Sequence, residues 1–124
     1  MDGLSTDAFM ALVADALEGL PQEVHDALDN VEVVTQEWPS PDQLDFTEGE
    51  DRYALLGLYE GIPLSDRVNY TMVLPDKVTL FQRPLEGVCA TQRELEHEVQ
   101  VTVVHELAHH LGWGDVDIHR MGFG

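Results

Sequence analysis

The spacing of hydrophobic residues predicts a helix near the start of the chain. Ser5 or Thr6 can cap this helix, which would end near Leu17 because a Gly-Leu-Pro sequence follows. One face carries an apolar stripe formed by Phe9, Leu12, Val13, Ala16 and Leu17. Shorter helical turns are expected over residues 22–28 and 115–121.

A second, longer helix is predicted to begin after Thr91 and to continue through Leu111. Thr91 and Glu94 have the spacing of a capping box, in which both side chains bind backbone N–H groups of the first turn. Most of the circumference of this helix is apolar, which indicates a central and buried position. Gly112 can end the helix because glycine readily takes the left-handed conformation.

Between the two helices, runs of β-branched and aromatic residues predict a small sheet. The predicted strands are residues 31–35, 53–60 and 77–81, and residues 70–74 could add a fourth. Residues 38–51, rich in proline and acidic side chains, are expected to form an exposed loop, and residues 84–90 a second loop. The pattern therefore predicts an α+β fold, in which a twisted sheet of three or four strands packs on the two helices. A chain of 124 residues suits one domain, residues 1–124.

The net charge of the chain limits the classes of partner that are expected. The 24 acidic and 6 basic residues give a formal net charge of −18, which disfavours nucleic acid and anionic membrane surfaces. A cationic partner or substrate is compatible with this charge. The first residues lack the basic segment and the apolar run of a signal peptide, and no stretch approaches the ~20 apolar residues of a membrane span. Cys89 has no second cysteine with which to form a disulfide. Together these features favour the cytoplasm.

The most informative segment runs from His105 to Asp115 and reads His-Glu-x-x-His-x-x-Gly-x-x-Asp. On a helix, His105 and His109 lie one turn apart and leave the same face, so that both imidazoles can bind one tetrahedral zinc ion. Glu106, about 100° further around, can reach a metal-bound water without binding the metal. The short His-Glu-x-x-His pattern also occurs in ordinary helices without a metal. Here, however, the apolar flanks would bury these polar side chains, which then need partners.

A third metal ligand is expected just beyond the helix. Gly112 lets the chain turn back, which would bring Asp115 to the metal, and carboxylates are accepted zinc ligands. Asp117 is the alternative if the chain turns later.

Other polar residues near the motif have less defined roles. His110 points about 140° away from His105, which favours packing, and His119 is expected to be solvated. Glu94 and Glu98 fall near the angular position of the two histidines and could line a cleft, although capping or solvation is commoner. Candidates to stabilise an oxyanion are His110, His119, Tyr53, Tyr59 and Tyr70.

Three blocks in this order resemble the small bacterial zincin-like metallopeptidases: residues 55–64, residues 77–85 and the segment from His105 to Asp115. The resemblance covers roughly residues 53–122. It implies a minimal zincin fold, zinc bound by His105 and His109, Glu106 as the catalytic base, and Asp115 in the position of the third ligand. The long motif is also similar to that of metzincins, which usually have histidine at the position of Asp115.

The expected activity is hydrolysis of peptide bonds by a zinc-activated water, with Glu106 as general base and a peptide or protein as substrate. A strand along the rim of the site would be the natural place for an extended peptide to pair. Two alternatives stay open. One is a metal-stabilised binding module that cleaves nothing, which an intact Glu106 argues against. The other is a zinc hydrolase of non-peptide amides or esters.

Overall fold

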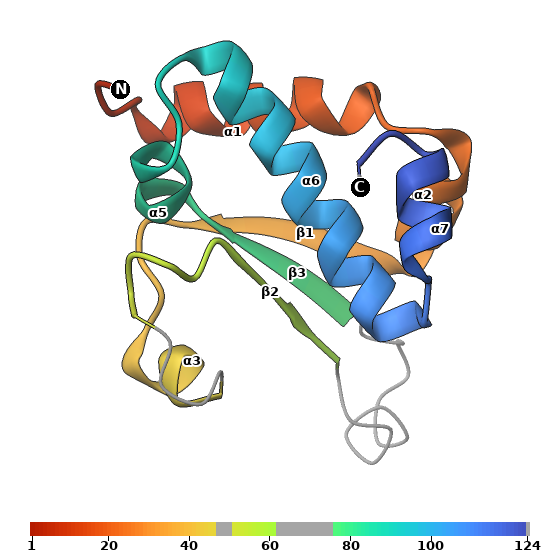
Figure 1. Ribbon diagram of the computed structural model, residues 1–124. Coiled ribbons are helices and arrows are strands. Elements are labelled where there is room, and N and C mark those ends of the chain that lie inside the picture. Colours follow the sequence, from red (N-terminus) through yellow and green to blue (C-terminus); the bar gives the residue numbers. More distant parts are fainter. Residues whose placement is uncertain (47–50, 62–75, 124) are drawn as a thin grey trace.

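A three-stranded mixed sheet forms the base of the protein. The computed structural model describes residues 1–46, 51–61 and 76–123 (Figure 1). In the sheet order β1-β3-β2, the central strand β3 (Asp76–Phe81) pairs in parallel with β1 (Val31–Gln36) and antiparallel with β2 (Gly57–Glu60). The predicted α+β class is confirmed. The strand considered at residues 70–74 lies outside the described residues.

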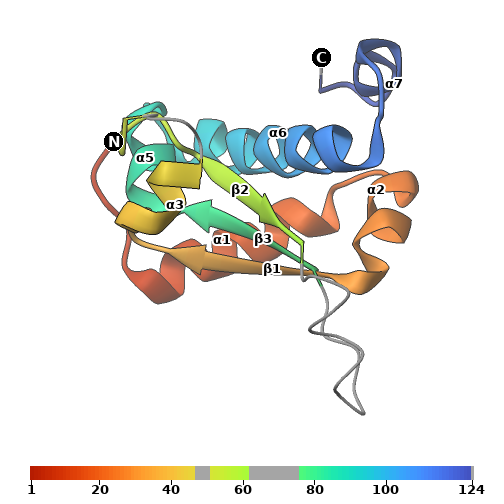
Figure 2. The same ribbon diagram turned by 90° about the horizontal axis from the view of Figure 1, so that it is seen from below.

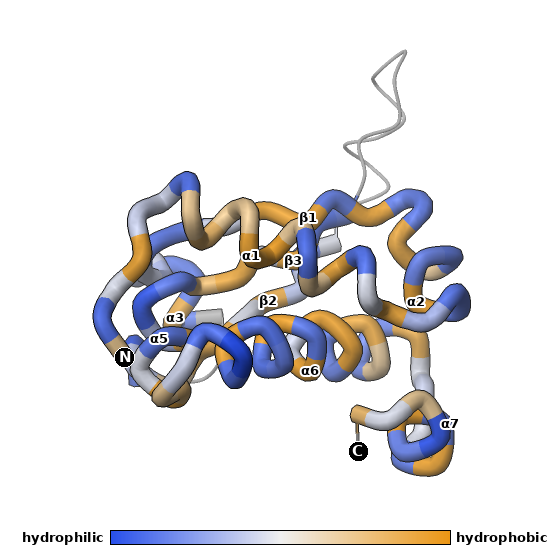
Figure 3. The backbone as a smooth tube through the Cα atoms, turned by 90° about the horizontal axis from the view of Figure 1, so that it is seen from above, coloured by the Kyte–Doolittle hydropathy of each residue, from blue (hydrophilic) through white to orange (hydrophobic). Residues whose placement is uncertain are grey.

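Two helices lie side by side over one face of the sheet (Figure 3). Helix α1 (Thr6–Glu18) begins at Ser5, whose side chain accepts the Ala8 N–H at 3.1 Å, so the predicted cap is confirmed. Gln100 of the second helix, α6 (Gln92–Leu111), donates to the Ala16 carbonyl at 2.8 Å and so joins the two helices. The core between helices and sheet is formed by Phe9, Ala16, Val78, Leu80, Leu95, Val99, Val103 and Leu107, among others.

Helix α6 begins and ends where the sequence predicts. The capping box forms, because the Thr91 side chain accepts the Glu94 N–H at 3.1 Å and the Glu94 carboxylate accepts the Thr91 N–H at 3.1 Å. Gly112 ends the helix in the left-handed conformation, with a φ of 75°. The expected short turns also form, as α2 (Gln22–Ala27), the 3-10 turn η1 (Leu28–Asn30) and α7 (Asp115–Arg120).

Two predicted loops contain short helices instead. Helix α3 (Pro41–Phe46) lies within the first loop, where Pro41 occupies the first helical position and the Ser40 side chain accepts the Gln43 N–H at 3.2 Å. Helix α5 (Gln82–Gly87) replaces the start of the second loop, and Pro84 lies in its first turn, where its missing N–H costs nothing. Strand β2 is also shorter than predicted, because a turn at residues 52–54 occupies the start of the predicted strand.

Helix α5 anchors the start of the chain through a buried carboxylate. Glu86 is only 4% exposed, accepts the Leu4 N–H at 2.7 Å, and pairs with Arg83 at 2.8 Å. Gln82 donates to the Leu4 carbonyl at 2.9 Å. Burial by itself raises the pKa of Glu86, but these hydrogen bonds to its charged form outweigh burial and hold the pKa below its ordinary value.

Helix α7 packs at the C-terminal end of α6, to one side of the two main helices (Figure 2). Ile118 is the buried residue of this helix. Arg120 forms a bidentate ion pair with Glu23 of α2, in which its two terminal nitrogens donate to the two carboxylate oxygens at 2.7 and 2.9 Å. The hydrogen bond from Arg120 lowers the pKa of Glu23. None of the helices in the described ranges has the length and apolarity that a membrane span requires.

Candidate active site

Helix α6 carries the two histidines and the glutamate of the motif next to β2. His105 and Glu106 are half-buried, whereas His109, one turn after His105, is exposed. The His105 Nε2 atom lies 3.0 Å from the carbonyl oxygen of Phe123. One ring nitrogen of this histidine is therefore engaged by the backbone at the end of the described chain.

Glu106 contacts the edge strand directly. Its Oε1 atom accepts the Tyr59 N–H at 3.0 Å, across the space between α6 and β2. The hydrogen bond from Phe81 N to Leu56 O shows that Leu56 directs its carbonyl towards β3. Along an antiparallel strand, the N–H and C=O groups of successive residues point alternately towards the partner strand and away from it. Gly57 and Tyr59 therefore direct these groups away from β3, towards α6 and the outer edge. Among the strands that the structure describes, β2 is the outermost on this side, so Glu106 is bound at an edge to which a further strand could add.

A second layer of contacts holds Tyr59. Its hydroxyl donates to Asp76 Oδ2 at 2.7 Å, and the His110 ring stacks on the tyrosine ring at 4.0 Å with an interplanar angle of 15°. His110 Nε2 also lies 3.8 Å from Asp76 Oδ2. His110 therefore packs, as predicted, and it does so against the strand that contacts Glu106.

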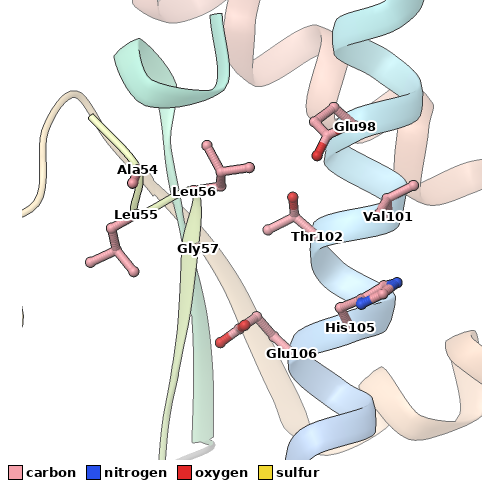
Figure 4. Close-up of a pocket in the computed structure, with 9 residues that line it drawn as sticks. All are labelled: Ala54, Leu55, Leu56, Gly57, Glu98, Val101, Thr102, His105 and Glu106. Atoms are coloured by element: carbon pink, nitrogen blue, oxygen red, sulfur yellow. The ribbon is translucent and has the colours of Figure 1, made fainter. Parts of the chain in front are cut away.

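A cavity of about 250 Å³ lies between α6 and the start of β2, together with the residues just before that strand (Figure 4). It is lined by Ala54, Leu55, Leu56, Gly57, Glu98, Val101, Thr102, His105 and Glu106. The cavity narrows at Gly57, because a Cβ atom added to this glycine would lie only 2.6 Å from Thr102 Cγ2. An isolated glycine within a strand signals such a close approach, and this signal was missed when the site was predicted from the sequence.

A second cavity, of about 550 Å³, opens on the other side of His105. It is lined by His105, Asp115, Val116, Ile118, His119 and Arg120. Val116 is 81% exposed, so an apolar side chain lies open beside the motif. The two cavities share only His105 among the residues that line them.

The candidate third ligands both lie in the first turn of α7. Asp115 is exposed and is the first residue of that helix. Asp117 accepts the Gly114 N–H at 3.2 Å and lies 3.7 Å from Arg120, so it already has structural contacts. Within residues 1–46, 51–61 and 76–123, no three His, Cys, Asp or Glu side chains lie close enough together to hold a metal.

The chemistry of the donor set nevertheless fits zinc. Imidazole nitrogens at one-turn spacing, with a carboxylate three residues beyond a helix-ending glycine, are ligand types that zinc accepts. The structure brings His105 and His109 onto one helix but does not gather Asp115 with them. The other oxyanion candidates are spread: Tyr53 stacks edge-on against Trp38 at 5.3 Å, His119 is exposed beside the second cavity, and Tyr70 lies outside the described residues.

Cys89 is not part of this site. It is buried, and burial together with the nearby charges of Glu98 and Glu94 raises the pKa of its thiol. A raised pKa disfavours the thiolate, which is the reactive form.

The fold and the motif together define a zincin-like class, in which a helix bearing His-Glu-x-x-His packs beside an edge strand. Residues 28–124 match the profile of the family described as zincin-like metallopeptidase, and the chain belongs to this family. A solved structure of a conserved hypothetical protein from T. thermophilus is similar, with 27% sequence identity and a TM-score of 0.50. The similarity covers 87% of this chain and 94% of that one. No curated protein sequence matches the chain.

Proposed function

We propose that the protein is a zinc-dependent peptidase that hydrolyses peptide bonds with Glu106 as general base. The observation that carries this proposal is the hydrogen bond between Glu106 and the N–H of Tyr59 on the sheet edge. An extended peptide that paired with β2 would run along the same edge. Its backbone would then lie within reach of the Glu106 carboxylate.

His105, His109 and Asp115 are the residues that would hold the metal. Zinc bound there would supply Lewis-acid polarisation of the scissile carbonyl and lower the pKa of water at the site. The proposal requires Asp115 to approach the two histidines from its place at the start of α7. Gly112 and Gly114 flank the turn between α6 and α7, and glycines let a turn change direction at small steric cost. His105 would also exchange its contact with the Phe123 carbonyl for the metal.

The surroundings of Glu106 support its proposed role as general base. A general base must lie within hydrogen-bond reach of the proton it removes. Glu106 is on the face of α6 that lines the cavity next to β2, where a bound peptide would present its carbonyl carbon to water (Figure 4). The carboxylate would take the proton from the attacking water and deliver it to the leaving amine. A glutamine at this position keeps the shape but lacks the basic oxygen.

The test compares wild type with Glu106→Gln, using zinc analysis by mass spectrometry and a fluorogenic peptide library. We expect equal zinc in both proteins, and turnover at least 100-fold slower in the variant, as is typical when a general base is removed. Glu96→Gln, on another part of α6, is the control and should cleave like wild type. If both proteins contain zinc and the wild type cleaves no faster than Glu106→Gln, the proposed peptidase activity is refuted. A metal-stabilised binding module would then remain.

A further inference from the structure

We propose that the cavity between β2 and α6 receives a lysine or arginine side chain of the peptide substrate, with Glu98 as the group that binds its positive charge. This inference rests on the proposed peptidase function, because it assumes that a peptide lies along β2. It adds a preference for one class of residue, which neither the motif nor the family supplies.

The chemistry of the cavity walls matches a basic side chain. On the side of β2 and the residues before it, Leu56 directs its apolar side chain towards α6, and Ala54, Leu55 and Gly57 also line the cavity (Figure 4). The facing side, from α6, carries the carboxylates of Glu98 and Glu106. Lysine and arginine have a long apolar stem and a charged end, so that the stem can lie on apolar surface while the end reaches a carboxylate.

The Glu98 carboxylate is open to a ligand in the described structure, although its charge also acts on the buried Cys89 thiol. Within residues 1–46, 51–61 and 76–123 Glu98 is half-buried and has no hydrogen bond or ion pair. Figure 4 shows its side chain on the same face of α6 as Thr102 and Glu106, directed towards β2. Arg93 lines a neighbouring cavity together with Glu98 but forms no ion pair with it. A cation that bound this carboxylate would form a charge-assisted hydrogen bond, which is stronger than one between neutral groups.

Size and charge favour one cationic side chain over a larger ligand. The volume of about 250 Å³ is below the roughly 300–1,000 Å³ of pockets that hold drug-sized molecules. The net charge of −18 attracts cationic peptides and repels acidic ones. Glu98 and Glu106 are two turns apart, about 12 Å along the helix axis, too far to share one metal ion.

That distance also limits where the basic residue stands in the substrate. An extended peptide advances about 3.3 Å per residue, so about 12 Å corresponds to three or four residues. The long stem of lysine or arginine shortens this separation. We therefore expect the basic residue within four positions of the bond that is cleaved.

Binding is measured on full-length Glu106→Gln protein, so that no peptide is consumed. The probes are fluorescein-labelled decapeptides of neutral sequence that contain one arginine, one norleucine or one glutamate at a scanned position, and the readout is fluorescence anisotropy. The arginine peptide should bind about tenfold more tightly than the norleucine peptide at its best position. Adding Glu98→Gln should reduce this ratio to below twofold, and Glu98→Lys should favour the glutamate peptide.

Glu96→Gln is the matched control, because it removes the same charge from the same helix but from a residue that does not line the cavity. If it reduces the arginine preference as much as Glu98→Gln does, the preference comes from net charge and the proposal is wrong. Equal binding of arginine and norleucine peptides to the parent protein would also overturn it.

Cleavage assays separate this inference from the proposed function. Glu106-dependent cleavage without a Glu98-dependent preference for arginine would leave the peptidase in place and refute the basic subsite. Glu98-dependent binding without any cleavage would support the subsite and refute the peptidase.

Discussion

Replacing Gly57 by alanine tests whether β2 is as closely packed on α6 as described. An added Cβ would lie 2.6 Å from Thr102 Cγ2 and 3.3 Å from the Thr79 carbonyl oxygen. Thr102 is buried and β-branched, and the second contact is with backbone, so neither neighbour can move freely. Overpacking of this kind costs about 1–3 kcal/mol. Gly57 does not have a positive φ, so alanine can adopt the same backbone conformation. Alanine also lowers the conformational entropy of the unfolded chain, and this gain offsets about 0.4–1 kcal/mol of the overpacking cost.

The expected net loss is about 1–2 kcal/mol in the free energy of unfolding, measured by urea denaturation. In a domain of this length that corresponds to a Tm lower by about 4–8 °C. Gly87→Ala is the matched control, because no heavy atom lies within 4 Å of its added Cβ. The control should be as stable as wild type or slightly more stable.

A double-mutant cycle identifies the contact responsible. Thr102→Ser removes the methyl group that the new Cβ would meet, and alone it should cost about 1 kcal/mol for the lost buried methyl. In the double variant the closest of the two contacts is gone, so its stability should exceed the additive expectation by about 1 kcal/mol. Unchanged stability in Gly57→Ala, or strict additivity in the cycle, would refute the close packing of the two elements.

Three further predictions concern the site and helix α5. His105→Ala and His109→Ala should each weaken zinc binding at least tenfold in competition with a chromogenic chelator, and unchanged affinity in either would reject the metal site. Asp115→Ala should weaken zinc more than Asp117→Ala does, and Asp115→His should retain the metal; the reverse order would assign the third ligand to Asp117. Glu86 has a lowered pKa in the fold, so its contribution to stability is present above the unfolded pKa of about 4.3 and is lost as pH falls through the lower folded value. Glu86→Gln should therefore cost about 1–3 kcal/mol at pH 7 and less in acid, and a cost independent of pH would contradict this assignment.

The long elements were predictable because their signals are local. The capping box of Thr91 and Glu94, the helix end at Gly112 and the apolar stripe of α1 each lie within one or a few turns, and all three form as expected. The short helices α3 and α5 were missed for a related reason. Six-residue helices have little periodicity to detect, and the prolines within them are ordinarily read as signals of a loop.

Only the part of the site that lies on helix α6 could be predicted from the sequence. The positions of His105, Glu106 and His109 follow from helix geometry, since a single element carries all three. The contact of Glu106 with Tyr59 joins residues 47 positions apart, and that of His105 with Phe123 crosses the turn after α6. Neither pairing has a signal in the sequence, because tertiary packing and the direction of α7 determine them. The place of Asp115 depends on the same turn, which is why its role remains a prediction.

The strand order has a consequence for how the chain folds during synthesis. Strand β3 lies between β1 and β2 in the sheet but follows both in the chain, so neither of them has its partner until residues 76–81 have been made. Helix α6, which covers the sheet, follows later still. From residue 36 to residue 81, about a third of its translation, the chain carries a valine-rich strand, β1, without its partner, and such unpaired strands are prone to aggregate. The abundant negative charge, present in the N-terminal half as well, keeps these unfinished chains apart from one another.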